Sequence, residues 1–514
     1  MLNRKTRFLT AVLPLFLALA PVPDGLEAQS AAESITEAEI RDHIWYLASD
    51  ALRGRDTGDE GYLQAAWYAA SQFMAAGVRP MYPDRAGSAG YFQPLQLFRY
   101  SYGPGNTAIL TGRAGRTELG FGADYIAISN SRGPLEITGS LTFAGFGIVD
   151  EEKDWDDLNG LDLNGTIPVV IAGFPGEEIT SAFAGEGSRN PWTSIRERIP
   201  LLEARGAAAI VVIIASGNLS EWSRQVSVFS GERLTVGTGA PRSMFPDAKV
   251  PLIFLESGTL RKLFSGQGYD PVSGEGTYST FPLEDVSLSV KMAVDRNEVD
   301  APNVVGLVEG TDPMLKDEYI VLGAHLDHVG VRNGEVYNGA DDNASGSVGV
   351  LEVAEAVAMA PAKRSVIFIC FAGEERGLLG ASHFVDNPPV PLERITTMVN
   401  IEMIGRWSHR PENTLFAIIG DNDAGEMRST LTGVNEAGFG YELEAPERFY
   451  GGSDHSAFHR VGIPNITIAG SPPYGTHEDY HGPGDDAEKI DCAAARKATA
   501  LIFELVMTLA NQGG

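Results

Sequence analysis

Histidines and carboxylates follow the ends of several apolar runs in the second half of this 514-residue sequence. In chain order, these residues are His325, Asp327, His328, Asp341, Asp342, Glu374, Glu375, Glu402, His477, Asp479 and His481, with the phenol of Tyr480 beside the last two. Imidazole nitrogen and carboxylate oxygen, without thiolate, are ligands that suit zinc or another divalent first-row metal. A charge beside a buried strand is costly unless it has a partner. The residue types and their placement therefore predict a metal centre.

The adjacent pair Glu374-Glu375 indicates how such a centre would work. It follows the apolar run SVIFICF at 365–371, which reads as a buried strand. Neighbouring side chains in an extended or turning segment point apart, so one glutamate can bind metal while the other faces the reacting water. At least five of the candidate residues can contact metal directly, which is enough for two ions that share a carboxylate. Such a site hydrolyses amides when a base accepts the proton of the water and returns it to the leaving amine.

The segment around His325 predicts a supporting residue for the metal ligands. His325 and Asp327 share one face of an extended segment, so the Asp327 carboxylate can accept from the ring N–H of His325 and fix its tautomer. Each motif alone has an ordinary explanation, because acidic residues favour helix N-termini and aspartates are common caps. Their occurrence at successive strand ends favours the metal centre.

Strands and helices alternate around these residues. The runs EYIVLGAH, SVIFICF, TTMVNIEMI and TLFAIIG read as strands, while ASGSVGVLEVAEAVAMA and AAARKATALIFELVMTLA have helical patterns. This alternation predicts an α/β fold with a mostly parallel central sheet flanked by helices. Functional residues in such sheets collect at the carboxyl ends of the strands.

A second, smaller α/β unit is predicted at residues 135–282. It contains LNGTIPVVIAGF, a turn and strand, and SIRERIPLLEARGAAAIVVII, a helix that ends at Gly206 before a buried strand. This segment has no histidine and no ligand-like spacing of acidic residues. We therefore expect 29–134 and 283–514 to form the domain that holds the metal centre.

The N-terminus has the three-part pattern of a secretory signal peptide. Basic MLNRKTR precedes apolar TAVLPLFLALA, and small residues follow up to an expected cleavage after Ala28. The apolar part is too short to span a bilayer, and no later stretch reaches the length of a membrane helix. We expect residues 1–28 to be removed and the protein to be exported, either to the periplasm or out of the cell.

The net charge and the cysteine content indicate which partners and which kinds of site are disfavoured. The formal charge is 39 − 68 = −29, spread along the chain, which disfavours nucleic acid as a partner. Cys370 and Cys492 are the two cysteines, and we expect two free, buried thiols in place of a disulfide or a thiolate zinc site. The sequence carries no signal of oligomeric state.

The motifs around the candidate residues resemble those of the M28 family of co-catalytic zinc peptidases, which includes secreted bacterial leucyl-type aminopeptidases. The motifs that carry the resemblance lie between about residues 300 and 495 and are AHLDH, GADDNASG, FAGEERGLLGA, NIEMIGR, GGSDHSAF and HEDYHGPGDDAEKID. Residues 135–282 look like a protease-associated (PA) domain inserted into the peptidase fold, and residues 35–80 fit the start of that fold.

The resemblance implies a ligand set for two zinc ions. It implies that His325 and Glu402 bind one ion, that Glu375 and His481 bind the other, and that Asp341 bridges them. Many members of the family have aspartate in place of Glu402, so the longer side chain puts the geometry of that ion in question. A milder departure is glycine at position 482, where threonine or arginine is frequent.

The resemblance also implies catalytic roles. Glu374 corresponds to the general base, Asp327 to the residue that supports a ligand histidine, and Tyr480 to a tyrosine that hydrogen-bonds the oxyanion in some members. A cis peptide bond between Asp341 and Asp342 is expected from the same resemblance.

The implied activity is that of an exported metallo-aminopeptidase that releases N-terminal residues from peptides. A carboxypeptidase or dipeptidase on the same scaffold is the nearest alternative, and it would need Arg406 or Arg448 as a cationic clamp for the substrate carboxylate. A non-catalytic PA-domain binding protein is a remote alternative, because every expected ligand and base position is filled. The preferred side chain at the cleaved position is not readable from the sequence.

Overall fold

The computed structural model describes residues 24–513 except 85–88, 103–104, 113–114, 131–133, 184–189, 215–221, 224, 227–231, 238–244, 246–247, 408–412, 421–423, 447–450 and 471–476. Residues 1–23 of the predicted signal peptide lie outside the described residues. From there, helix α1 (Asp24–Ser34) runs across the expected cleavage point after Ala28.

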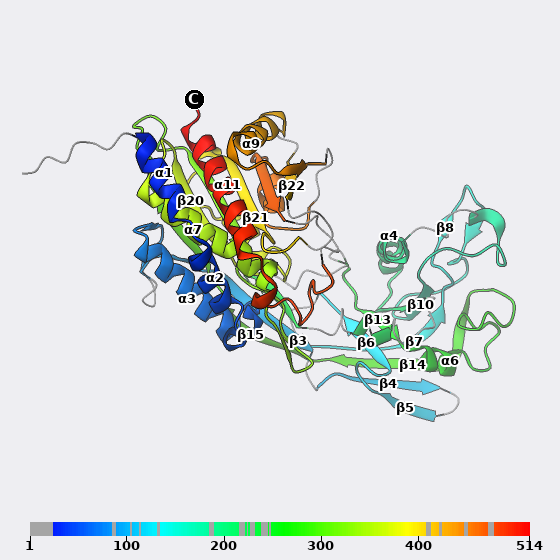
Figure 1. Cartoon of the computed structure of the whole chain (residues 1–514). Helices are drawn as coiled ribbons and strands as arrows, with labels where there is room; N and C mark the ends of the chain where they lie inside the picture. Colours follow the sequence, from blue (N-terminus) through cyan, green and yellow to red (C-terminus); the bar gives the residue numbers. More distant parts are fainter. Residues whose placement is uncertain are drawn as a thin grey trace, which may run out of the picture. The chain divides into compact units, whose positions relative to one another are not determined.

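The chain divides into two compact units, drawn in Figure 1. The first contains Met1–Gln93 and Pro302–Gly514, and the second is the insertion Pro94–Ala301. The predicted boundaries at 135 and 282 are therefore wrong, because the insertion begins earlier and ends later. The physical reason is strand pairing, which joins segments before residue 135 to strands far later in the insertion.

A mixed sheet forms the centre of the first unit. Its strands among the described residues are β1 (Arg79–Pro80), β2 (Phe92–Gln93), β16 (Asn303–Val308), β17 (Tyr319–His325), β20 (Ser365–Phe371), β21 (Ile395–Glu402), β22 (Thr414–Ile419), β23 (Glu442–Glu444) and β24 (Asn465–Ala469). Their order is β1-β16-β20-β17-β21-β24-β22-β23, with β2 also paired to β16. The neighbours β20, β17, β21 and β24 are parallel to one another. The prediction of an α/β fold with a mostly parallel central sheet is confirmed.

Helices cover both faces of this sheet. The first-unit helices are α1, α2 (Glu37–Leu47), α3 (Glu60–Ala75), α7 (Gly346–Met359), α8 (Leu379–Asp386), α9 (Ala424–Gly438), α10 (His455–Arg460) and α11 (Cys492–Asn511). In Figure 1, α7 and α11 lie in front of the sheet, and both contact β17. On the opposite face, Phe384 of α8 and Phe458 of α10 pack with Ile367 and Ile369 of β20. Burial on both faces explains why all of β20 is apolar apart from its first residue.

Short elements connect the helices and strands of the first unit. They are η1 (Asp50–Arg55), β18 (Gly330–Arg332), β19 (Glu335–Tyr337), the helical turn η4 (Ala340–Ser345), η5 (Leu392–Arg394) and η6 (Ala487–Lys489). Strands β18 and β19 form a hairpin. This hairpin leads directly into η4, which carries the paired aspartates of the sequence.

The second unit has its own sheets and core. Its described elements are β3 (Gln96–Tyr102), β4 (Thr107–Gly112), β5 (Gly115–Leu119), β6 (Tyr125–Ile128), β7 (Leu135–Phe143), β8 (Val149–Asp150), β9 (Trp155–Asp156), β10 (Ile167–Ile171), η2 (Ser181–Phe183), α4 (Pro191–Ala204), β11 (Ile210–Ile213), β12 (Arg233–Val236), β13 (Leu252–Leu255), α6 (Ser257–Phe264), β14 (Phe281–Met292) and β15 (Val294–Asp300). The larger sheet has the order β5-β4-β14-β7-β10-β11-β13-β6, and β12-β3-β15 form a smaller one. The predicted helix before Gly206 is α4, and the buried strand after it is β11. The resemblance to a PA domain stays a prediction.

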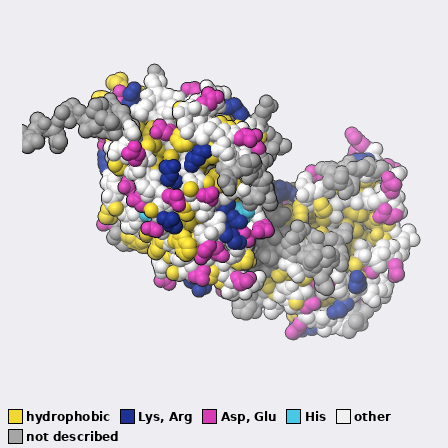
Figure 2. All heavy atoms as spheres, in the orientation of Figure 1, with side chains coloured by type: hydrophobic (Ala, Val, Ile, Leu, Met, Phe, Trp, Pro, Cys, Tyr) yellow, Lys and Arg dark blue, Asp and Glu magenta, His cyan; other side chains and the backbone are white. Residues whose placement is uncertain are grey.

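Charges and cysteines agree in part with the sequence-based expectations. Figure 2 shows acidic side chains scattered over the visible face of the first unit, with basic side chains among them. Both cysteines are free, as predicted, but only Cys370 is fully buried, because Cys492 begins α11 at the surface. Among the described residues, no helix combines the length and apolar content needed to cross a bilayer.

Candidate metal centre

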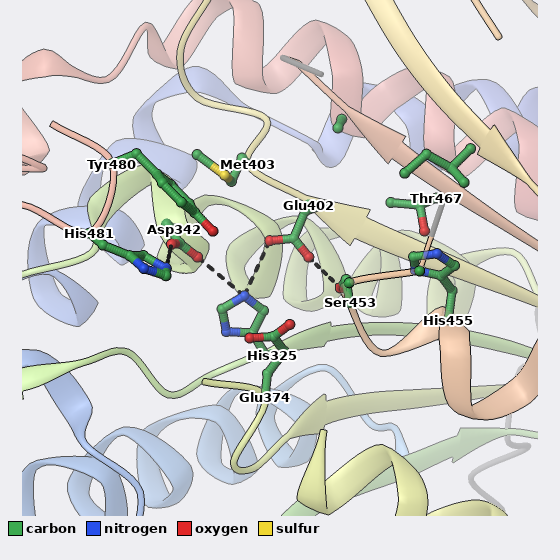
Figure 3. A pocket seen from close by; sticks show the side chains of 14 residues that line it. His325, Asp342, Glu374, Glu402, Met403, Ser453, His455, Thr467, Tyr480 and His481 are labelled. Atoms are coloured by element: carbon green, nitrogen blue, oxygen red, sulfur yellow. Dashed lines mark hydrogen bonds and ion pairs between the residues drawn. The ribbon is translucent and has the colours of Figure 1, made fainter. Parts of the chain in front are cut away.

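Neighbouring parallel strands bring the candidate residues to one edge of the first-unit sheet. Strand β17 ends at His325, β21 ends at Glu402, and Glu374 and Glu375 follow the end of β20 after a short turn. The η4 turn places Asp342 beside them, and Figure 3 shows the pocket that His325, Asp342, Glu374 and Glu402 line. The expectation that successive strand ends converge is confirmed.

One cluster consists of His325, Asp342 and Glu402. The Nε2 atom of His325 lies 3.2 Å from Oε1 of Glu402 and 3.3 Å from Oδ1 of Asp342 (Figure 3). The other ring nitrogen, Nδ1, is 2.9 Å from the main-chain oxygen of Asp327. Because a carbonyl oxygen only accepts, Nδ1 carries the proton and the lone pair of Nε2 points toward the two carboxylates.

This contact corrects the role predicted for the Asp327 side chain. Its carboxylate lies 3.9 Å from the His325 ring, and the main-chain oxygen fixes the tautomer instead. The carboxylate accepts from the main-chain N–H groups of Glu374 and Glu375 at 3.1 and 3.3 Å. Asp327 therefore supports the two glutamates directly, because the chain bends after β17 and turns the carboxylate toward the loop after β20.

A second cluster consists of His328, Asp342 and Glu375. The Nδ1 atom of His328 is 3.0 Å from Oε1 of Glu375 and 3.8 Å from Oδ2 of Asp342. His481 reaches the same oxygens, with Nε2 at 3.2 Å from Glu375 and 3.1 Å from Asp342. The two clusters share Asp342, so the structure has two candidate metal sites joined by one carboxylate.

The bridging role predicted for Asp341 is therefore wrong. The Asp341 carboxylate accepts from the N–H of Gly405 at 2.7 Å, and its other oxygen lies 3.5 Å from Nε2 of His477. The cis peptide bond lies between Asp342 and Asn343, one residue later than expected. Consecutive side chains in this irregular turn point in different directions, and two adjacent aspartates cannot be told apart without the backbone.

The two adjacent glutamates have opposite electrostatic environments. Burial raises the pKa of Glu374 well above its usual value. Burial and Asp342 oppose ionisation of Glu375 as well, but contacts with His328 and His481 lower its pKa to about 2. Pairs of carboxyl groups with pKa values pushed apart indicate separate acid–base and ligand roles. Glu375 belongs to a metal cluster and Glu374 does not, and the role of Glu374 as the base stays a prediction.

The longer side chain of Glu402 is accommodated by a partner that sequence reasoning missed. Its Oε1 faces His325, while Oε2 accepts from the hydroxyl of Ser453 at 2.5 Å (Figure 3). Ser453 belongs to the GGSDHSAF motif, which the resemblance included without assigning a role. His328 was similarly noticed in the sequence, but the implied ligand set omitted it.

Buried polar atoms in the two clusters indicate that a ligand is needed here. Oδ2 of Asp342, Oε1 of Glu375 and Nδ1 of His328 are buried without a hydrogen bond of good geometry, and they face one another and His481 instead. Nε2 of His328 is buried and makes no hydrogen bond. Such unsatisfied groups are costly in the interior of a protein. Nitrogen and oxygen donors without thiolate fit zinc, so the residues fit a pair of zinc ions.

We expect metal analysis of purified protein to give about two zinc ions per chain, because each cluster offers at least three ligands. The measurement is elemental analysis after extensive dialysis against metal-free buffer, with activity recorded on the same sample. Full activity at a ratio near zero would contradict a metal centre, and full activity at a ratio near one would contradict a shared pair.

The chain is similar to known peptidases. Residues 303–506 match the model of Peptidase family M28. Over 212 residues, the chain is 31% identical to "Aminopeptidase YwaD" of Bacillus subtilis (strain 168), an alignment that covers 40% of this chain and 44% of that protein. It is 28% identical to a "Probable leucine aminopeptidase" of Arthroderma benhamiae over 39% of this chain and 56% of that protein. The chain thus spans about half the length of the curated relatives it matches.

Solved structures share the fold over nearly the whole chain. "Aminopeptidase from Aneurinibacillus sp. strain AM-1" superimposes with a TM-score of 0.59 and 19% identity, covering 95% of this chain and 97% of that one. A zinc aminopeptidase from Bacillus subtilis gives a TM-score of 0.53 at 19% identity, covering 93% and 96%. Residues 303–506, which contain both clusters, thus match the model of Peptidase family M28, and the solved structures share the fold of the chain.

Proposed function

We propose that this protein is an exported two-zinc aminopeptidase that removes N-terminal residues from peptides. The observation that carries the proposal is the pair of clusters sharing Asp342, with a further glutamate, Glu374, lining the adjoining pocket. Zinc, when bound, supplies Lewis acidity that polarises the scissile carbonyl and makes water a better nucleophile. Export rests on the N-terminal sequence pattern alone.

Glu374 is the proposed general base. It accepts a proton from water as the new bond to the carbonyl carbon forms, and it donates that proton to the leaving nitrogen as the C–N bond breaks. Burial raises the pKa of its carboxyl group, so the protonated state is accessible between the two steps. Asp327 holds the main chain of Glu374 and thereby the position of the base.

Tyr480 is the proposed donor to the oxyanion. Its ring stacks on that of His481 with centroids 4.0 Å apart, and both residues line the pocket. Burial, together with nearby carboxylates, raises the pKa of Tyr480, so its hydroxyl keeps a proton to donate. A preorganised donor of this kind stabilises charge that develops only in the transition state.

The charges at the pocket favour a substrate with a free amine. Asp342, Glu374 and Glu402 line it, and their carboxyl oxygens would accept hydrogen bonds from a cationic N-terminus. The carboxypeptidase alternative needs a cationic clamp, but Arg406 lies 3.0 Å from Asp479 and 3.7 Å from Asp485. Arg448, the other clamp considered, lies outside the described residues.

We expect N-acetylated peptides to be cleaved far more slowly than the same peptides with a free N-terminus, because acetylation removes the charge that the acidic pocket attracts. The measurement is product release from matched pairs of peptides, with C-terminal amides as the control. Similar rates on free and acetylated substrates, or a strict need for a free C-terminus, would favour the carboxypeptidase alternative.

A further inference from the structure

Arg55, which lies outside the matched family region, connects two ligand-bearing segments of the metal centre. Its side chain is fully buried. The guanidinium donates to the main-chain oxygens of Leu326 at 2.8 Å, Asn338 at 2.7 Å and Gly339 at 2.8 Å, and also to that of Leu47. Leu326 directly follows the histidine of the first cluster, and Gly339 precedes the shared aspartate by three residues. One side chain therefore fixes the separation of these two segments.

Thr57 reaches the same centre through Asp327. Its hydroxyl donates to Oδ2 of Asp327 at 2.8 Å, and both side chains are fully buried. The Asp327 carboxylate in turn accepts from the N–H groups of Glu374 and Glu375. Thr57 thus orients the carboxylate that holds the base and a metal ligand in place.

Asp56 completes the contact with the loop after β20. Its carboxylate accepts from Nε of Arg376 at 2.9 Å and from a second nitrogen of the same guanidinium. Arg376 directly follows Glu375. Such a two-point ion pair fixes direction as well as distance.

The backbone beside these residues is packed closely against neighbouring main chain. Gly54 has φ of +70°, and a Cβ there would lie 2.3 Å from the main-chain oxygen of Tyr337 and 2.7 Å from that of Gly330. A Cβ on Gly330 would in turn lie 2.7 Å from Cβ of Asp56. The segment is therefore packed directly against the main chain that precedes η4.

We propose that segment 55–57 is a positioning element for the metal centre, which sets the relative placement of its ligand-bearing loops through three consecutive side chains. The expected effect of this element on kcat rests on the proposed function, whereas its expected effect on zinc affinity does not. None of the three side chains is itself in either metal cluster. The competing explanation is that they contribute only to general folding stability.

The test compares Thr57→Val, which keeps the shape and removes the hydroxyl, with Thr57→Ser, which restores it. The matched control is Arg53→Ala, an exposed position of the same loop. Three quantities are measured: zinc affinity by competition with a chromophoric chelator, kcat and KM on a free peptide, and the melting temperature of metal-free protein. Removing outer partners of metal ligands typically costs 10–100-fold in affinity or activity.

We expect Thr57→Val to lose roughly 10–100-fold in zinc affinity or kcat with little change in KM, and we expect Thr57→Ser and Arg53→Ala to resemble the parent. Arg55→Lys should lower zinc affinity or kcat further, because it removes several buried hydrogen bonds. Since that variant can also fold poorly, the comparison of Thr57→Val with Thr57→Ser is the test of the proposal. Parent-like zinc affinity and kcat in Thr57→Val would overturn the proposal, even if its metal-free melting temperature fell. If the parent protein binds zinc but cleaves no peptide, the proposed function is wrong. The zinc affinities of Thr57→Val and the parent then still test whether segment 55–57 positions the metal centre.

Discussion

Glu374→Gln is expected to lower kcat by roughly 10²–10⁴-fold, the usual contribution of a general base, while zinc content stays at the parent level. The amide keeps the size of the side chain but cannot accept the proton from water. Glu374 belongs to neither metal cluster, so its substitution should not release metal. The measurement is steady-state kinetics together with elemental analysis of the same preparation.

The matched control for this prediction is Glu375→Gln. Glu375 lies within 3.2 Å of two histidines and belongs to the second cluster. Its substitution should weaken zinc binding and reduce the stabilisation that zinc gives to the folded protein. Loss of zinc in Glu374→Gln, with zinc and activity retained in Glu375→Gln, would mean that the two roles are reversed.

Asp342→Asn should have the largest effect on metal content, because Asp342 belongs to both clusters. We expect zinc affinity to fall by more than the roughly 100-fold that removal of an outer partner costs. The rise in melting temperature on adding zinc should shrink accordingly, since ligand stabilisation depends on the ratio of free zinc to Kd. Zinc titration followed by calorimetry measures both quantities.

Asp341→Asn is the control for this prediction, with identical chemistry one residue earlier. The Asp341 carboxylate bonds to the main chain of Gly405 and belongs to neither cluster. The Asp341→Asn variant should therefore retain both zinc ions, with some loss in the free energy of unfolding. Loss of zinc in Asp341→Asn and its retention in Asp342→Asn would restore the assignment that the sequence suggested.

The general architecture of the site was predictable from the sequence because it depends on strand ends. The apolar run of β20 after its first residue, with its neighbours, indicated parallel strands, and the polar residues after them had to meet at one edge. His325, Glu375 and Glu402 were found in this way. The choice between Asp341 and Asp342 was not predictable, because it depends on how the backbone turns within η4 and not on residue type.

Two other features depend on contacts that leave no local signal. The predicted boundaries of the insertion failed because β4 and β6 pair with β14 and β13, strands far away in the sequence. The role of Asp327 was misjudged because the backbone oxygen, not the carboxylate, contacts His325. Patterns of residue types describe side chains well, but they do not show where main-chain groups point.

The contacts of Arg55 constrain the order in which the protein can assemble during synthesis. Its partners lie 271 to 284 residues later in the chain, apart from Leu47. At roughly 5–20 residues per second, a ribosome needs on the order of tens of seconds to reach them. During that interval only the Leu47 oxygen, of these four partners, is available to the guanidinium, so its contacts with Leu326, Asn338 and Gly339 form after the whole insertion has been made. Pairing of Gln93 with Asn303 then joins the two ends of the insertion, which shortens the loop whose closure opposes assembly. The first unit is therefore expected to fold late, after the strands that follow the insertion have been synthesised.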